Sequence, residues 1–454
     1  MEIYSTRREQ YKHLIVFCAN ALTLILEVLP FAWFWYRVAF PLMRNPFAGM
    51  GSLAMVLIYA LILFLFTRAL NGYNISSMRT YEAVVSNLLA LFCTNLVAYV
   101  LVGLVTVNYF NIPLIIGLTV LEMAVLALWV VLVRYVFTAL YPPHTMIVVW
   151  SDFDPSEIIE KLVLRRDRYD VCETISLSQG YEKVEEQILK YEAVLLYNLE
   201  AKERNDMLKF CYDHSIRTYL TPKISDILIS GMEGIYLFDT PLYLARNMGL
   251  TPLQRFWKRL TDIVVSAIGL VIASPFMLLI AIAIKLCDGG PVFYRQTRLT
   301  RNGREFRIYK FRSMYVDSEK SGARLASKHD SRVTPVGKVI RNLHFDELPQ
   351  LINVLKGEMS IVGPRPERPE IVEEYQASIP EYSFRIRVKA GITGYAQVYG
   401  RYNTEPIDKL KYDMMYIQHY SLSLDFKIML LTFKILFQKE NAEGVDDSKR
   451  TAIK

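Results

Sequence analysis

The chain has 454 residues, about three times a typical single-domain length, so several domains are expected. An apolar fraction of 52% with 21% charged residues excludes a disordered or collagen-like chain. The net charge is +3 for residues 1–145, −6 for 146–250 and +10 for 251–454. The basic third requires an anionic partner: nucleic acid, a lipid surface or a phosphorylated small molecule.

Residues 1–145 are expected to form a four-helix transmembrane domain. Four apolar stretches each approach the ~20 residues that a helix needs to cross a bilayer: 14–34, 50–69, 83–107 and 112–137. Basic residues are more frequent on one side of this bundle, which by the positive-inside rule places both of its ends in the cytoplasm. Glu27 and Glu122 lie inside these helices, where a carboxyl group is either functional or hydrogen-bonded to a neighbouring helix.

Residues 146–250 are expected to form a small cytoplasmic α/β domain. Short β-rich runs alternate there with charged amphipathic stretches, which is typical of a parallel sheet of Rossmann type. Strands are predicted at 146–150, 194–197 and 216–220, and helices at 155–166 and 202–214. The turn at 151–155 has no glycine to admit a pyrophosphate, so we interpret the fold as degenerate and without a nucleotide cofactor.

The apolar segment 263–284 is long enough to span a membrane, yet basic residues flank it on both sides. Both flanks are therefore expected in the cytoplasm, which a straight crossing does not allow. At Ser274-Pro275 the proline removes a helical hydrogen bond, and the serine hydroxyl can cap the freed backbone. We therefore predict a re-entrant helix that bends at this dipeptide; a kinked spanning helix is the alternative.

Two adjacent carboxylates stand in the basic third. In Asp346-Glu347-Leu348-Pro349 the early proline predicts a helix that begins with Asp346 as its N-cap. The helix N-terminus and Arg341 are expected to keep Asp346 ionised, as a nucleophile requires. Glu347 points about 100° away around the helix, so it can hold a divalent cation or handle a proton. A structural N-cap beside a surface glutamate is the alternative.

A second feature favours a functional site. In Pro364-Arg365-Pro366 two prolines fix the backbone around one guanidinium, a group suited to bidentate phosphate contact. The dense basic run 295–312 has alternatives to a binding site. Charge runs are usually solvated faces, and contact with lipid headgroups alone could account for this one.

Five motifs follow one another along this third: Tyr309-Lys-Phe-Arg-Ser-Met314, Asp346-Glu-Leu-Pro-Gln350, Val354-Leu-Lys-Gly-Glu-Met-Ser-Ile-Val-Gly-Pro-Arg-Pro366, Gly391-Ile-Thr-Gly-Tyr-Ala-Gln397 and Leu424-Asp-Phe-Lys-Ile428. In these motifs residues 255–440 resemble the catalytic domain of the bacterial polyprenyl-phosphate hexose-1-phosphate transferases, the monotopic phosphoglycosyl transferases. The whole chain is similar to the large members that start capsule and exopolysaccharide synthesis on undecaprenyl phosphate.

The resemblance implies a mainly α monotopic transferase domain at 251–440, with the re-entrant helix 263–284 broken at Ser274-Pro275. It implies that Asp346 attacks the sugar-proximal phosphate of a UDP-sugar, releasing UMP and leaving a phosphosugar-aspartyl intermediate that the lipid phosphate then attacks. Glu347 would bind Mg²⁺. Basic side chains would neutralise the phosphates, as two anionic substrates require: Lys310, Arg312, Arg341 and Arg365.

The resemblance also implies a location and partners. The enzyme is expected in the bacterial inner membrane with its catalytic domain on the cytoplasmic face, acting on a UDP-sugar, UDP-glucose or UDP-galactose by likeness to the large members. Nucleic acid is not expected as a partner, and a homodimer remains open. Segments within 409–439 are expected to be amphipathic helices lying in the membrane interface, or else buried core helices, and 441–454 is expected to be disordered.

The motifs depart from the family in places. His344-Phe345 stands where Ser-Leu is commoner, Lys389-Ala390-Gly391 lacks the usual proline, and Tyr395 stands where tryptophan is frequent. These departures leave the dyad intact but affect sugar specificity and the turn at 389–402. His344 is close enough to the dyad to offer an acid or base as an alternative role.

Two other functions are compatible with parts of the sequence. A membrane-bound NAD-dependent sugar-nucleotide dehydratase also joins four helices to an α/β domain, but it needs a glycine-rich fingerprint and a helical Tyr-x-x-x-Lys. Here that spacing occurs at Tyr219–Lys223, with Pro222 inside it. A non-enzymatic scaffold that binds anionic lipids would explain the basic charge and leave the dyad unused.

Overall fold

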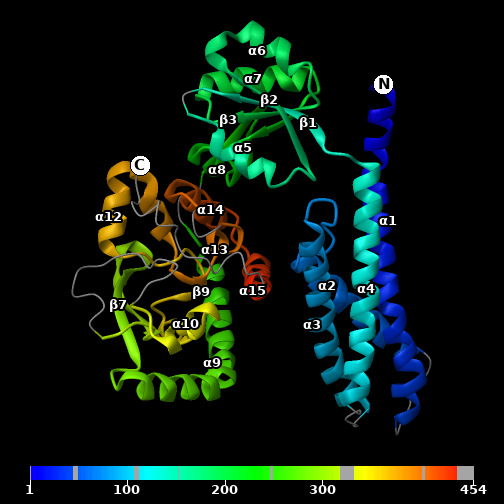
Figure 1. The fold of residues 1–454 in the computed structure, drawn as a ribbon, viewed down its shortest axis with the longest axis vertical. Coiled ribbons are helices and arrows are strands. Elements are labelled where there is room, and N and C mark those ends of the chain that lie inside the picture. The colour runs from blue at the N-terminus through cyan, green and yellow to red at the C-terminus, as the bar shows by residue number, and fades with distance from the viewer. Residues whose placement is uncertain are drawn as a thin grey trace. The chain divides into compact units, whose positions relative to one another are not determined.

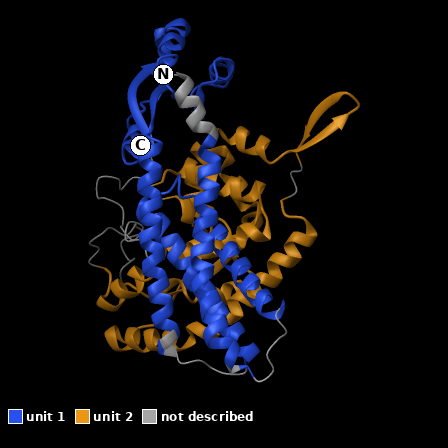
Figure 2. Ribbon diagram, turned by 90° about the vertical axis from the view of Figure 1, so that its right-hand side faces the viewer, with its two compact units in different colours: residues 1–221 blue, residues 222–454 orange. Residues whose placement is uncertain are grey.

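The computed structural model describes residues 2–43, 50–106, 112–151, 153–245, 249–316, 332–400 and 404–436. The chain divides into two compact units, residues 1–221 and 222–454, each of which is described by itself (Figures 1 and 2). Residues 222–250, predicted as the end of the α/β domain, fall in the second unit. The tail predicted to be disordered, 441–454, lies outside the described residues.

The first unit begins with four long apolar helices: α1 (Glu2–Phe34), α2 (Met50–Ala69), α3 (Thr80–Thr106) and α4 (Ile112–Leu140). Short π and 3₁₀ turns, Trp35–Ala39 and Phe40–Leu42, extend α1. Large apolar side chains also cover the outside of these helices: Leu104 is 69% and Leu128 74% exposed. A helix that is apolar all round suits a membrane. Together with α9 of the second unit, these are the five described helices long and apolar enough to cross one.

A hydrogen-bonded network connects α2, α3 and α4. The Tyr59 hydroxyl donates to Asn95 Oδ1 over 2.7 Å, and Asn95 Nδ2 donates to Glu122 Oε2 over 2.7 Å. Glu122 is therefore hydrogen-bonded to a neighbouring helix, which is one of the two roles expected for it. Glu27 on α1 is also buried, with 5% of its surface exposed.

A four-stranded sheet follows the helices, with strand order β2-β1-β3-β4 and all neighbours parallel. Its strands and helices are β1 (His144–Trp150), β2 (Tyr169–Ser176), β3 (Ala193–Tyr197), β4 (Arg217–Leu220), α5 (Ser156–Val163), α6 (Tyr181–Ile188) and α7 (Ala201–Asp213), with a 3₁₀ turn at Leu177–Gln179. The expected parallel sheet is confirmed. The prediction omitted β2, in which the alternate residues Asp170, Cys172 and Thr174 are exposed. Tyr219 lies in β4, a strand, where a dehydratase would need a helix.

Charged residues join the sheet to the helices within the first unit. Arg134 of α4 pairs with Asp167 over 2.9 Å and donates to the Ile75 carbonyl over 2.9 Å. Arg165 donates to the Ser77 carbonyl over 2.7 Å. Because Ile75 and Ser77 lie in the turn between α2 and α3, these bonds attach the α/β part to that end of the helices.

The second unit is mainly helical. Before α9 it holds α8 (Ile224–Ser230) and a hairpin of β5 (Glu233–Leu237) and β6 (Thr240–Leu244). After α9 come β7 (Phe293–Leu299), η4 (Arg301–Gly303), β8 (Glu305–Phe311), α10 (Pro335–Asn342), η5 (Phe345–Glu347), α11 (Gln350–Lys356), β9 (Ser360–Val362), α12 (Pro369–Ser378), η6 (Pro380–Arg387), β10 (Gly391–Thr393), α13 (Tyr395–Tyr399), α14 (Pro406–Gln418) and α15 (Leu422–Leu436). Strands β7 and β8 pair antiparallel, and β9 and β10 pair parallel.

Helix α9 (Pro252–Asp288) is continuous in its hydrogen bonding yet bent, as Figure 1 shows. Thr251 caps its start, where its hydroxyl accepts from the Gln254 amide over 3.3 Å. Pro275 lies inside it, and the Ser274 hydroxyl donates to the Val271 carbonyl over 2.8 Å, as expected at a proline-induced kink. Gly289 ends the helix in the left-handed conformation that favours glycine.

The core of the second unit is built around α14. Its Leu410 and Met414 are fully buried, and Tyr416 is 1% exposed. They pack with Val354 of α11 and Ile428 of α15 in one apolar cluster. The core interpretation therefore applies to α14. Helix α15 buries Ile428 but leaves Phe426 and Phe433 exposed, by 50% and 60%.

Candidate active site

The two adjacent carboxylates lie on η5, a short 3₁₀ turn between α10 and α11. His344 before it adopts φ 55°, a left-handed conformation that non-glycine residues seldom take. The turn thus separates α10 from α11, which begins only at Gln350 with Pro349 as its N-cap. The prediction that Asp346 is the N-cap of this helix is therefore wrong. The left-handed residue ends α10 and starts a separate turn that holds the dyad.

Glu347 forms the centre of a charged cluster. Its Oε1 accepts from Lys310 Nζ over 2.7 Å and from Arg365 Nη2 over 2.8 Å. Burial by itself would raise the pKa of Glu347, but Arg365 and Lys310 outweigh it and hold the pKa well below its usual range. Glu347 is thus an anion that fixes two cations beside Asp346.

Asp346 is half-buried, and the charges around it act on its pKa differently from those around Glu347. Burial raises its pKa above the usual range, and the neighbouring Glu347 adds to this. Lys310 and Arg341 offset the rise only in part. Of the two groups expected to favour the ionised form, the helix N-terminus does not lie at Asp346, and Arg341 lowers the pKa without outweighing burial. The carboxylate is more basic than a solvated aspartate, and a more basic carboxylate is the stronger nucleophile while it remains ionised.

Asn353 on α11 holds the two halves of this cluster together. Its Nδ2 donates to the Arg307 carbonyl over 2.8 Å, and its Oδ1 accepts from the Tyr309 amide over 2.9 Å. These bonds fix β8 against α11 and so keep Lys310 opposite Glu347. Sequence reasoning missed Asn353, although a lone amide within the apolar run 351–355 was a signal, because a buried amide needs partners.

Arg365 is positioned by Arg385, a buried arginine that sequence reasoning also missed. Arg385 is 4% exposed and its Nη2 donates to the Arg365 carbonyl over 3.0 Å. It is held in turn by Asp413 over 2.8 Å and by the Tyr382 hydroxyl over 2.6 Å. The loop that carries Arg365 therefore rests on a buried ion pair.

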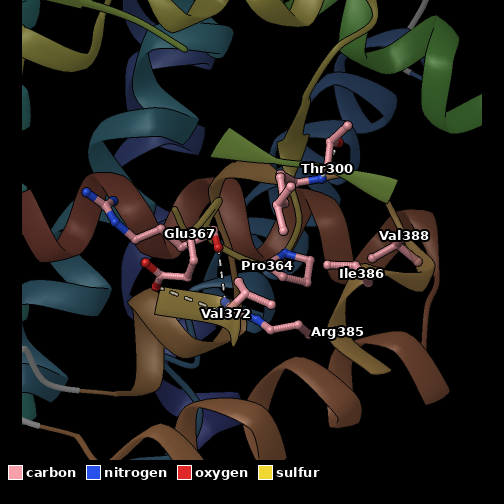
Figure 3. Close-up of a pocket in the computed structure, with 10 residues that line it drawn as sticks. Thr300, Pro364, Glu367, Val372, Arg385, Ile386 and Val388 are labelled. Atoms are coloured by element: carbon pink, nitrogen blue, oxygen red, sulfur yellow. Dashed lines mark hydrogen bonds and ion pairs between the residues drawn. The ribbon is translucent and has the colours of Figure 1, made fainter. Parts of the chain in front are cut away.

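A small pocket lies behind this loop (Figure 3). Charged and apolar side chains share its wall, among them Thr300, Pro364, Glu367, Val372, Arg385, Ile386 and Val388. Glu367 lies 3.8 Å from Arg385 and 3.6 Å from Arg298. Of the charged residues that line the pocket, Glu367 and Arg385 pair with each other and Arg365 pairs with Glu347, so the pocket supports the Arg365 loop.

The other predicted site residues lie elsewhere. Arg312 is 6% exposed and pairs with Asp288 at the end of α9, so the structure does not bring it to the Glu347 cluster. The pairing with Asp288 explains this position, because a buried guanidinium must be neutralised. Ser274 and Pro275 lie within α9, at its bend. In the sequence they are far from the dyad. His344 is exposed beside the dyad.

Three charged residues of α9 join this helix to the segments that carry the site. Arg259 donates to the last carbonyls of α11, those of Val354 and Leu355, over 2.6 and 2.8 Å. Asp262 accepts from the Ser360 hydroxyl and the Ile361 amide, both over 2.9 Å. Lys258 pairs with Asp425 over 2.7 Å. Helix α11, which follows the dyad turn, and strand β9, which leads to Arg365, are thus both anchored on α9.

The predicted magnesium ion can be tested against the donors present. Among the described residues no group of three or more His, Cys, Asp or Glu is placed to hold a metal. Mg²⁺ is usually bound by one or two carboxylates together with substrate phosphates. Both ion pairs of Glu347 are made by its Oε1 oxygen, so its Oε2 oxygen takes part in neither of them. The two adjacent carboxylates of Asp346 and Glu347 therefore fit a magnesium site of that kind.

Residues 253–439 match the protein family described as bacterial sugar transferase. The chain is 41% identical to an N-acetylgalactosaminephosphotransferase of Aeromonas hydrophila that acts on UDP-N-acetylgalactosamine and undecaprenyl phosphate; the match covers 52% of this chain and 56% of that protein. It is 43% identical to UDP-glucose:undecaprenyl-phosphate glucose-1-phosphate transferases of Klebsiella pneumoniae and Caulobacter vibrioides. The match with the Klebsiella protein covers 45% of this chain and 43% of that protein. The match with the Caulobacter protein covers 41% of this chain and 71% of that protein. The chain thus spans about half the length of the first two relatives.

Proposed function

The chain belongs to the bacterial sugar transferase family, and we propose that it transfers a sugar-1-phosphate from a UDP-sugar to undecaprenyl phosphate, releasing UMP. The observation that carries the proposal is the Lys310–Glu347–Arg365 cluster beside Asp346, within the matched residues 253–439. Two anionic substrates must approach one another in this reaction. A nucleophilic carboxylate with three cations around it provides both the attacking group and the neutralising charge.

The transfer proceeds in two displacements at one phosphorus atom. A carboxylate oxygen of Asp346 bonds to the sugar-proximal phosphorus, and the bond from that phosphorus to the UMP oxygen breaks, so UMP leaves with the electron pair. An oxygen of undecaprenyl phosphate then bonds to the same phosphorus. The Asp346–phosphorus bond breaks, which regenerates the carboxylate and leaves a lipid-linked diphosphosugar. Lys310, Arg341 and Arg365 stabilise the charge on the phosphoryl oxygens.

Magnesium is part of the proposal, and Glu347 with Asp346 would hold it. A bound Mg²⁺ supplies charge neutralisation between phosphate groups. Glu347 also orients the two cations that flank Asp346, because its Oε1 accepts from both. Its side chain is therefore needed whether or not a substrate is bound.

We propose that α1 to α4 cross the bacterial inner membrane as a bundle and that the transferase unit acts on its cytoplasmic face. The packing of α9 supports a re-entrant course. Its first part contacts α11 and β9 through Arg259 and Asp262. Its last part packs through Ile284 against Phe311 of β8 and Ile340 of α10. Both ends of one helix thus contact the same compact unit, which a straight crossing would prevent.

The lipid-facing surface of α9 agrees with this course. Large apolar side chains on both sides of Pro275 are exposed, with Val271 at 74% and Leu279 at 65%. Such a surface suits one leaflet of a bilayer. The dyad would then lie at headgroup level, where the phosphate of undecaprenyl phosphate is. Exposed Phe426 and Phe433 on α15 support a further interfacial contact.

The sugar is proposed to be a hexose, glucose or galactose, and the step to be the first membrane step of exopolysaccharide or capsule synthesis. The relatives' names include both glucose and N-acetylgalactosamine, so the family itself accepts more than one sugar. A panel of UDP-sugars assayed with the full chain identifies the substrate. A homodimer belongs to the same proposal.

The test is UMP release by the full chain in a membrane mimetic, with UDP-sugar, Mg²⁺ and undecaprenyl phosphate. Asp346→Asn is expected to lower the rate by at least ~10³-fold, because the nucleophile is lost. Asp408→Asn is the matched control, since Asp408 is a partly exposed carboxylate of the same unit that pairs only with Lys411 over 3.0 Å among the described contacts. Undiminished UMP release from Asp346→Asn would remove the nucleophile assignment.

A further inference from the structure

Two carboxylates lie deep among the apolar helices of the first unit. Glu27 of α1 and Glu122 of α4 are 5% and 6% exposed. Most of the sequence of these helices, namely 14–34, 50–67, 80–106 and 112–133, contains no lysine, arginine or histidine. An unpaired charge in apolar surroundings is costly, so an ionisable residue inside a membrane helix pairs with another group or marks a binding site.

The hydrogen bonds of the bundle use only part of these two carboxylates. Asn95 Nδ2 donates to Glu122 Oε2 over 2.7 Å and to the Thr119 hydroxyl over 3.1 Å. Glu122 Oε1 takes part in none of the described hydrogen bonds, and Glu27 Oε1 is buried without a hydrogen-bond partner. A buried polar atom without a partner is rare, and a group that the chain itself does not supply is one explanation for it.

A pocket between α1, α3 and α4 borders this polar cluster. Three aromatic side chains line it together with aliphatic ones: Phe31, Phe34 and Tyr99. Its polar lining is formed by Asn95, Thr119 and Glu122. The empty space, with the mouth of the pocket included, is about 390 Å³. The pocket therefore has room for a small head group and not for a whole lipid.

Glu27 lies beside the same pocket. Because it precedes Phe31 by one helical turn, both side chains lie on one face of α1. The Phe31 ring stacks on that of Tyr59, with the centroids 3.9 Å apart. Glu27 interacts electrostatically with Glu122, and both act on the Tyr59 hydroxyl. The two carboxylates thus belong to one cluster at the polar side of the pocket.

The lining of the pocket reaches one end of the helix bundle. Phe34 is the last residue of α1, and Ile115 lies in the first turn of α4. Glu122 lies about 15 Å from the start of α4, at a rise of 1.5 Å per residue. From this end, a ligand would meet aromatic and aliphatic side chains first and the carboxylates last.

The chemistry of the lining distinguishes between cations. A metal ion needs several oxygen, nitrogen or sulfur ligands, and the described residues place no group of three or more His, Cys, Asp or Glu to hold one. A proton would neutralise a carboxylate but has no use for an aromatic wall. Ring faces attract organic cations, and a carboxylate pairs with their charge. Aromatic and aliphatic side chains beside a carboxylate therefore suit an ammonium ion that carries apolar substituents.

We propose that this pocket binds the ammonium head group of a lipophilic amine, which pairs with Glu122 and Glu27. The head group supplies the positive charge that the helices lack, and its apolar substituents contact the aromatic and aliphatic lining. The site lies wholly within the first unit. It does not depend on the transferase reaction, and it gives a binding function to helices that carry none of the proposed catalytic residues.

The first test is equilibrium binding of hexyltrimethylammonium to the full chain in nanodiscs, with binding to empty nanodiscs subtracted. This probe is charged at every pH. We expect saturable binding of one cation per chain. Glu122→Gln should weaken it by at least ~10-fold, because the buried partner of the cation loses its charge. Glutamine can still accept from Asn95, so the contact between the helices is kept.

Glu82→Gln is the matched control, because Glu82 lies in the first turn of α3, at the opposite end of the bundle. It is expected to bind the probe as the wild type does. Circular dichroism and thermal unfolding show whether each variant is folded. Glu27→Gln provides a second measurement at the other carboxylate, and it should also weaken binding by at least ~10-fold.

The second test concerns the aromatic wall. Phe34→Leu should weaken binding by about 2–30-fold, which corresponds to the loss of one cation–π contact. Phe92→Leu is its matched control, since Phe92 on α3 is 51% exposed and does not line the pocket. It is expected to leave the affinity unchanged. Uncharged 1-octanol, which has a similar length to the probe, should not compete with it.

Four results would each overturn the proposal. The first is the absence of saturable binding above that of empty nanodiscs, and the second is wild-type affinity in folded Glu122→Gln and Glu27→Gln. Equal competition by 1-octanol would show an apolar pocket without a cation site, and competition by an equal concentration of sodium would show a site for an inorganic ion. Loss of UMP release with cation binding intact would count against the proposed function alone.

Discussion

Two lysine–carboxylate pairs of the second unit lie in opposite settings. Glu347 accepts from Lys310 and also from Arg365, and the cluster borders the half-buried turn of the dyad. Asp425 accepts from Lys258 over 2.7 Å and from the Tyr416 hydroxyl over 2.8 Å, and all three side chains are buried. The first cluster has more cations than anions around it, and the second has one of each.

The two carboxylates respond to these settings in opposite directions. Burial raises the pKa of Asp425, and Lys258 offsets the rise only in part. Burial also opposes ionisation of Glu347, yet Arg365 and Lys310 lower its pKa. A surplus of cations at the surface is ready to receive further anions, as substrates with phosphates require. A balanced buried pair instead joins helices α9 and α15.

The largest effect is expected from breaking the balanced pair. Lys258→Met leaves Asp425 buried without its cation, which costs about 3–5 kcal/mol of unfolding free energy. Thermal or denaturant unfolding of the full chain in detergent measures it. The double variant with Asp425→Leu is the control, because removal of both charges should recover most of the loss. A single variant as stable as the wild type would show that the pair does not join the two helices.

A smaller effect, on activity and not on stability, is expected at the surplus cluster. Arg365→Met should lower the rate of UMP release by about 10²–10³-fold, since a group that stabilises developing charge is lost. Unfolding should shift by less than about 1 kcal/mol, because Arg365 is half exposed and Lys310 still pairs with Glu347. Equal loss of stability in Arg365→Met and Lys258→Met would contradict the distinction between the clusters.

The pH dependence of stability sharpens the same comparison. Because the pKa of Glu347 is lowered on folding, its contribution is complete above its ordinary pKa of 4.5 and is lost as pH falls below it. Between pH 7 and pH 4, Glu347→Gln should therefore lose about 1 kcal/mol less stability than the wild type. Thermal unfolding at both pH values measures the difference. Parallel losses in the two proteins would show that the cluster does not hold Glu347 ionised.

The smallest effect is expected at His344. His344→Gly removes the side chain and suits the left-handed turn, so UMP release should stay within about twofold of the wild type if the residue only shapes the dyad turn. A general acid or base at this position would instead contribute about 10²–10⁴-fold. A loss of that size, with a changed pH–rate profile, would assign His344 to the chemistry.

Local patterns in the sequence predicted the helices, the parallel sheet and the dyad. Over the described residues the apolar stretches of the first unit lie within α1 to α4, and the short runs at 146–150 and 194–197 are strands. These features depend on residues near one another in the chain. The structure also shows Lys310 and Arg365 both paired with Glu347. The resemblance of the motifs had indicated these three residues, but not how they contact one another.

The rest depends on contacts between distant segments. Arg312 was expected with the phosphates, but its partner Asp288 lies 24 residues earlier at the end of α9. Asp346 was expected to cap a helix, but the left-handed His344 starts a separate turn, and single-residue conformations of that kind leave no periodic signal. Asn353 and Arg385 act through backbone atoms of other elements, so their roles could not be read from spacing.

The bend in α9 affects how the protein would respond to its bilayer. A helix that enters one leaflet and returns adds cross-sectional area to that leaflet only, so in the proposed arrangement its insertion depends on the lateral pressure there. Helices α1 to α4 would instead respond to bilayer thickness, which they must match along their length. Lipids that change thickness and lipids that change leaflet packing should therefore act on different parts of the molecule, and the catalytic unit should be sensitive to the second kind.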